Sequence, residues 1–166
     1  MIRVLLLVTI FLSGCASAPK GSLSFDEVNI PEPSSDLSIL VFYRLISPPA
    51  CCDMRVSIND EQVTALPNYS FSYVALKPGS HNLKVSWNPM MLTPSKTRVI
   101  SIEPNTTKYV QLNSSVYTPM GIQLGSDRNA EQSEKLATSK LKECCKFIDS
   151  KNSNKSKQQG LSGGTR

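Results

Sequence analysis

Several features that define common protein classes are missing from this chain of 166 residues. A membrane-spanning helix needs about 20 apolar residues, whereas the longest run, Val4 to Leu12, is shorter and is broken by Thr9. The chain has a single histidine, His81, and lacks the G-x-S-x-G, H-E-x-x-H, G-x-G-x-x-G and phosphate-loop motifs. The sequence therefore specifies no reaction. We expect a protein that is not an enzyme and that has no cofactor.

A basic surface for nucleic acid is also missing, although the formal net charge is +5. One positive charge belongs to Arg3, and residues 149–166 hold four basic residues against one acid. Residues 15–148 then carry thirteen basic and twelve acidic residues. A folded part with so little excess charge has no electrostatic footprint for nucleic acid, so we expect no such partner.

The N-terminus has the pattern of a signal peptide: Arg3, an apolar run, and then the small residues Ser13 and Gly14. Cys15 follows directly. The sequence Leu-Ser-Gly-Cys at 12–15 resembles the lipobox of bacterial lipoproteins. This resemblance implies that residues 1–14 are removed and that Cys15 is the lipidation site. A plain secretory signal with a cysteine there by chance is the alternative.

The same resemblance implies a location. Acyl chains contribute about 0.8 kcal/mol per buried CH₂, so two or three chains anchor a protein to a lipid bilayer without a transmembrane helix. In lipoproteins of this kind, a residue other than Asp after the lipidated cysteine, here Ala16, implies sorting to the outer membrane. We expect a lipid-anchored protein of the bacterial cell envelope whose domain is in the periplasm.

Composition divides the mature chain into three parts. Residues 15–36 are rich in serine and proline and predict a tether, unless their apolar side chains dock on the domain. Those side chains are Phe25, Val28 and Ile30. Residues 37–148 are long enough for one domain with a hydrophobic core. Residues 149–166 contain one large apolar residue and predict a disordered basic tail, with contact to anionic envelope surfaces as the alternative.

Short runs rich in β-formers, separated by turn residues, occupy most of the domain. We predict strands at 38–44, 54–58, 62–66, 71–76, 81–87, 97–103 and 108–113, and a further one within 120–124. Asn59 and Asp60 tolerate the left-handed dihedrals of a tight hairpin, and Gly79 suits a turn position with positive φ. Because no helical segment interrupts these runs, they predict a mainly β fold: an antiparallel β-sandwich of seven or eight strands.

One helix is expected after the strands. It is predicted between Asp127, a suitable N-cap residue, and Ile148. Apolar residues recur there at helical spacing, at Ala137, Leu141, Cys144, Cys145 and Ile148. We therefore expect one C-terminal helix that buries this stripe.

The order of four segments carries a family resemblance: SILVFYR, VSINDEQVTAL, SYVALKPGSHNLKVSW and SIEPNTTKYVQL. Together they resemble the bacterial lipoprotein family called domain of unknown function 2846 and, more distantly, PEGA domains, over about Ser38 to Asn113. The resemblance implies a small envelope β-sandwich. It implies no catalytic residue, and Asn59-Asp60 stands where these families commonly have glycine.

Four cysteines remain after Cys15: Cys51 and Cys52 in a proline-containing loop, and Cys144 and Cys145 on the predicted helix. Neighbouring cysteines rarely bridge, because their Cα atoms lie 3.8 Å apart whereas a disulfide usually spans 4.4–6.8 Å. Since the envelope is oxidising, we expect at least one disulfide between the loop pair and the helix pair. A four-thiolate zinc site and reduced, packed cysteines are the alternatives.

Two functions follow from these features. The first is a non-catalytic binding or assembly module, anchored to the bilayer through Cys15. Such a module would recognise an envelope protein or cell-wall polymer through a sheet edge or its loops. The alternative is an envelope hydrolase or thiol protein in which His81 acts with Cys51 or Cys52.

Overall fold

The computed structural model describes residues 18–87, 93–117, 123–125 and 129–150. The predicted signal peptide, Cys15 and the predicted tail from Lys151 onward lie outside these residues.

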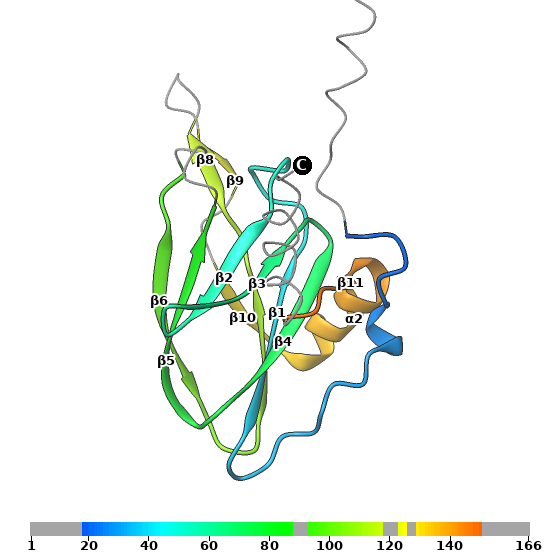
Figure 1. Cartoon of the computed structure of the whole chain (residues 1–166), viewed down its shortest axis with the longest axis vertical. Helices are drawn as coiled ribbons and strands as arrows, with labels where there is room; N and C mark the ends of the chain where they lie inside the picture. The colour runs from blue at the N-terminus through cyan, green and yellow to red at the C-terminus, as the bar shows by residue number, and fades with distance from the viewer. Residues whose placement is uncertain (1–17, 88–92, 118–122, 126–128, 151–166) are drawn as a thin grey trace, which may run out of the picture.

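Two sheets form the body of the domain (Figure 1). The first has five strands in the order β10 (Ala130–Gln132), β7 (Thr107–Gln111), β1 (Ser38–Arg44), β4 (Ser70–Leu76) and β11 (Lys146–Phe147). The second has four in the order β3 (Glu61–Leu66), β2 (Met54–Ile58), β5 (Gly79–Ser86) and β6 (Lys96–Ile102). A separate pair is formed by β8 (Ser115–Tyr117) and β9 (Gln123–Gly125). This arrangement confirms the predicted mainly β sandwich.

The central strand β1 explains why its sequence, SILVFYR, is almost continuously apolar. All seven of its residues are buried, because β1 is covered on both faces. Leu40 and Phe42 point into the core between the two sheets. Ile39 and Tyr43 point the other way, into a second apolar cluster beneath α2 (Glu134–Cys144). In Figure 1, α2 and the N-terminal segment cover this outer face of the first sheet.

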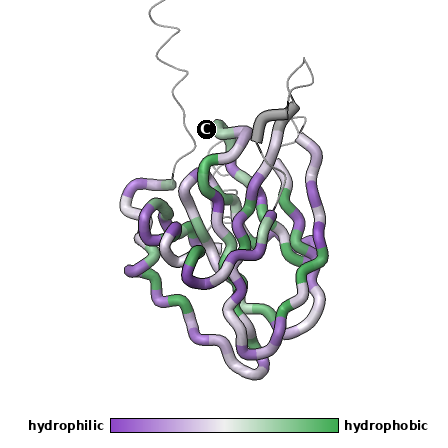
Figure 2. Tube along the Cα trace, turned by 180° about the vertical axis from the view of Figure 1, so that it is seen from behind, coloured by the Kyte–Doolittle hydropathy of each residue, from purple (hydrophilic) through white to green (hydrophobic). Residues whose placement is uncertain are grey.

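Strands β2 and β6 show the alternation that their sequences predict. In β2, for example, Met54, Val56 and Ile58 are buried and the intervening residues are partly exposed. Figure 2 shows the same alternation along the chain as changes between hydrophobic and hydrophilic residues. The β2–β3 hairpin has Asn59 at φ 49° and Asp60 at φ 68°, as the left-handed turn requires.

Two strand pairings differ from the predicted antiparallel arrangement. The central β1 pairs in parallel with β7, with Val41 opposite Tyr109, and β4 pairs in parallel with β11. Two parallel strands that lie side by side in a sheet need a long connection between them. The connection from β1 to β7 includes all strands of the second sheet. Pairings between strands so distant in sequence cannot be recognised from local patterns.

The C-terminal helix is present but begins later than predicted. Its N-cap residue is Ser133, so the predicted start at Asp127 is wrong; Asp127 itself lies outside the described residues. The helix starts late because Ala130–Gln132 pairs with β7 as β10. It buries Ala137 and Leu141, as its periodicity predicts.

The segment from Pro19 to Ile30, here called the N-terminal strap, docks on the domain and is not a free tether. Phe25, Val28 and Ile30 pack against the apolar cluster beneath α2. The backbone nitrogen of Phe147 donates a hydrogen bond of 2.8 Å to the carbonyl of Leu23. The structure therefore confirms the alternative prediction, that these apolar side chains dock on the domain.

A short 3₁₀ turn, η2 (Phe25–Glu27), stiffens the strap. The Glu27 carboxylate accepts hydrogen bonds from the backbone nitrogen of Ser24 at 2.7 Å and from its hydroxyl at 2.5 Å. Both bonds favour the charged carboxylate and lower the pKa of Glu27. Asp26 also forms an ion pair with Lys142 of α2 at 2.9 Å.

A fully buried guanidinium organises the loop that follows β1. Arg44 donates five hydrogen bonds: to the hydroxyl and the carbonyl of Ser47 and to the carbonyls of Pro49, Cys52 and Leu66. These bonds use all five N–H donors of the side chain. Arg44 therefore fixes the path of the proline-containing loop over the end of the sandwich.

Candidate functional site: the open edge of β4

Strand β4 is paired along its full length on one side but along only part of its length on the other. Along one side it pairs with β1 over its whole length, Ser70–Leu76. Along the other side, the two-residue strand β11 pairs only with Ser70 and Phe71. Within the described residues, no strand pairs with the rest of β4 on that side. In the described part of the chain, residues 72–76 of β4 therefore form an open sheet edge.

The hydrogen bonds to β11 show which peptide groups face this edge. The backbone nitrogens of Lys146 and Ile148 donate to the carbonyls of Tyr69 and Phe71, at 3.0 and 2.9 Å. Because successive residues of a strand direct their peptide groups to opposite sides, the next residues facing outward are Tyr73 and Ala75. Their backbone groups are the donors and acceptors that an added strand would use.

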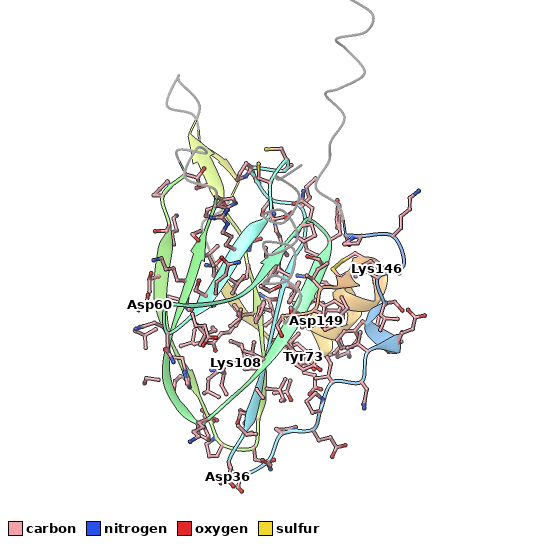
Figure 3. The ribbon with its side chains drawn as sticks, viewed as in Figure 1. Asp36, Asp60, Tyr73, Lys108, Lys146 and Asp149 are labelled. Atoms are coloured by element: carbon pink, nitrogen blue, oxygen red, sulfur yellow. A yellow bond between two sulfur atoms is a disulfide. The ribbon has the colours of Figure 1, made fainter. Side chains whose placement is uncertain are left out.

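A groove of about 490 Å³ lies beside this edge. It is lined by Tyr73, Val74, Ala75, Phe147, Asp149 and Ser150. Figure 3 shows Tyr73 and Asp149 beside β4. Most of the lining is apolar, and only Asp149 brings a charge. The groove therefore combines exposed backbone groups with an aromatic wall.

The aromatic wall is held in place by ring contacts that reach the N-terminal strap. Tyr73 stacks on Phe147 with ring centroids 5.7 Å apart, and Phe147 contacts Phe71 at 5.5 Å. Phe71 in turn contacts Phe25 of the strap at 5.4 Å. Such pairs contribute about 0.5–1.5 kcal/mol each beyond the area they bury. Through this chain of ring contacts, the strap is in contact with the aromatic wall of the groove.

The opposite side of the sandwich is closed by charged side chains. Glu131 of β10 forms ion pairs with Arg98 of β6 at 3.4 Å and with Lys108 of β7 at 3.3 Å. Arg98 also donates to the carbonyl of Asn129. Partly exposed pairs stabilise little, but they occupy the space between the sheets. The open edge of β4 has no comparable cover in the described part of the chain.

The predicted disulfide between the two cysteine pairs does not form. Cys144 and Cys145 are instead bonded to each other, with Cα atoms 3.7 Å apart. The Cys51 and Cys52 sulfur atoms lie 2.8 Å from each other. The two pairs have different surroundings: Cys145 is in the cluster beneath α2, whereas the loop pair is tied to Arg44 at the end of the sandwich.

This pairing also bears on the zinc alternative. A four-thiolate site needs all four sulfurs of both cysteine pairs, and those of Cys144 and Cys145 are bonded to each other. Within the described residues, no three His, Cys, Asp or Glu side chains gather where they could hold a metal ion.

The only histidine has a local structural role. His81 Nε2 lies 2.8 Å from the carbonyl of Lys77, and Nδ1 lies 3.0 Å from the side-chain nitrogen of Asn59. A carbonyl only accepts, so Nε2 carries the proton and Nδ1 accepts from Asn59. His81 thus lies beside the Asn59 end of β2, whereas Cys52 precedes its other end. The thiol–histidine pair of the alternative function is not assembled.

The sequence did not reveal the groove residues. The run 71–76 was predicted as a strand, but which of its edges stays open depends on pairing between distant segments. Phe147 was predicted to lie in the last turn of the helix, whereas in the structure it belongs to strand β11.

Comparison with protein-family models finds no match, and no curated protein is significantly similar to the chain. No helix within the described residues is both long and apolar enough to cross a membrane.

Proposed function

We propose that this protein is a non-catalytic envelope lipoprotein that binds an extended segment of a partner protein along the open edge of β4. The observation that supports this proposal is the groove beside Tyr73 and Ala75, where outward-facing peptide groups meet an aromatic wall. Main-chain hydrogen bonds give affinity in strand addition, and pockets for alternate side chains give specificity.

The chemistry of the groove favours a particular occupant. A protein segment supplies N–H and C=O groups at the two-residue spacing of Tyr73 and Ala75, which a cell-wall glycan does not. Tyr73 and Phe147 favour an apolar or aromatic side chain in the groove.

The proposed anchor places this groove close to a membrane. Lipidation at Cys15 stays a prediction from the lipobox, as does membership of the family called domain of unknown function 2846. Leu23, the strap residue bonded to Phe147, follows Cys15 by eight residues. A fully extended chain covers at most about 3.6 Å per residue, so Leu23 lies within about 30 Å of an acylated Cys15.

Site-specific photocrosslinking in intact cells tests the proposal. A photoreactive phenylalanine analogue replaces Tyr73 in the groove or, as the control, Leu136, which is 47% exposed on α2 and so lies on no strand edge. We expect a discrete adduct from position 73, with the crosslinked residues mapping to one extended stretch of one partner, and none from position 136. Equal crosslinking from both positions, or scattered attachment sites from position 73, would contradict binding at the β4 edge.

A further inference from the structure

The loop between β1 and β2 presents two thiols side by side. The Cys51 side chain is exposed, Cys52 is half-buried, and their sulfur atoms lie 2.8 Å apart. In Figure 1 this loop is at the end of the sandwich, and none of its residues lines the groove along β4. Neither thiol takes part in the proposed binding function.

The backbone of this loop is held on both sides of the thiols. Arg44 donates to the carbonyls of Pro49 and Cys52 at 2.9 and 2.7 Å. The side-chain nitrogen of Asn68 donates to the carbonyl of Ala50 at 2.7 Å. These bonds fix the peptide groups that carry the two cysteines, so the short sulfur–sulfur distance belongs to an ordered loop.

The two thiols differ in how far they are exposed to solvent. The hydrogen bond between the two sulfur atoms raises the pKa of Cys52. Cys51 is also the more exposed of the two. Cys51 is therefore placed to react first, with Cys52 directly behind it.

We infer that Cys51 and Cys52 form a thiol–disulfide exchange site that reduces small or protein disulfides. The Cys51 thiolate attacks one sulfur of a disulfide R–S–S–R, forming a mixed disulfide at Cys51 and releasing RS⁻, which takes up a proton. Cys52 then loses its proton and attacks the Cys51 sulfur. The second RS⁻ leaves and is protonated, and the Cys51–Cys52 disulfide remains.

A disulfide between neighbouring cysteines already occurs elsewhere in this chain. Cys144 and Cys145 form such a bond at the end of α2. The two electrons that reduce R–S–S–R come from the two thiols, so no further co-reactant is needed. The substrate class is thus any disulfide that can reach the exposed Cys51.

Glutathione disulfide is a suitable probe for the full-length protein. The protein is first treated with limiting dithiothreitol until Cys51 and Cys52 are reduced. Trypsin then isolates both thiols in one peptide, because no lysine or arginine lies between Arg44 and Arg55. Mass spectrometry of this peptide without reduction separates its reaction from that of every other cysteine.

We expect the wild-type peptide to lose two hydrogens, to retain no glutathione and to release two glutathione thiols per protein. Cys52→Ser should stop at the mixed disulfide and keep one glutathione on Cys51. Cys51→Ser should react on the order of tenfold more slowly, since the exposed thiol is lost. Wild-type protein that keeps glutathione as Cys52→Ser does, or that leaves both thiols unreacted, would overturn the inference.

Discussion

Replacing Arg44 with methionine is expected to lower the free energy of unfolding by about 3 kcal/mol. Four carbonyl oxygens, those of Ser47, Pro49, Cys52 and Leu66, lose their donor together. A buried acceptor left without a partner costs about 1–3 kcal/mol. Methionine retains much of the packed volume and removes a buried charge, and some of the carbonyls regain water. The net loss is therefore smaller than four full penalties.

Urea unfolding at neutral pH measures this loss. Arg55→Met is the matched control, because Arg55 lies on the neighbouring strand β2 and is only half-buried. We expect this control to change the unfolding free energy by less than about 0.5 kcal/mol. If the two variants are equally stable, Arg44 does not organise the loop as its hydrogen bonds indicate.

Replacing Cys15 with alanine is expected to abolish acylation altogether. The Cys15 thiol is the group in the proposed lipobox that takes the diacylglycerol, and each buried CH₂ contributes about 0.8 kcal/mol to membrane binding. Mass spectrometry of the tryptic peptide that ends at Lys20 is the direct measurement. In the wild type it should begin at an acylated Cys15, and in Cys15→Ala it should be absent.

Cys51→Ser is the matched control, because it removes a thiol outside the predicted lipobox and should leave the acylated peptide intact. Detergent phase separation of whole envelopes reports the same outcome for the intact protein. Should Cys15→Ala be cleaved after Gly14, carry no acyl chain and still partition with membranes, the proposed anchor is wrong.

The strands were predictable because their alternation is local. β2 alternates along its length, and β5 alternates from Leu83 to Ser86, because one face is buried and the other is not. β1 was also found, although it does not alternate, because a short run of β-branched and aromatic residues suits a strand covered on both faces. The hairpin at Asn59-Asp60 was predictable from turn chemistry alone.

Other features depend on contacts between distant residues. The helix was predicted to start too early, because pairing of Ala130–Gln132 with β7 outweighs the N-cap preference of Asp127. The predicted cysteine pairing was wrong, because the sequence does not show that Cys144 and Cys145 are bonded to each other beneath α2 while the loop pair lies at the end of the sandwich. The open edge of β4 is itself a consequence of where the parallel strand β11 ends.

Amide hydrogen exchange at Tyr73 and Ala75 is the most direct test of the central claim, that β4 accepts an added strand. A synthetic peptide of the crosslinked partner segment is added to the full-length protein. We predict slower exchange at these two outward-facing amides, with Val74 unchanged because its amide already faces β1. Ala75→Pro, which removes one edge donor at a position where strand edges tolerate proline, should weaken binding about tenfold or more. Peptide binding that leaves exchange at Tyr73 and Ala75 unchanged, or that Ala75→Pro does not weaken, would contradict the account.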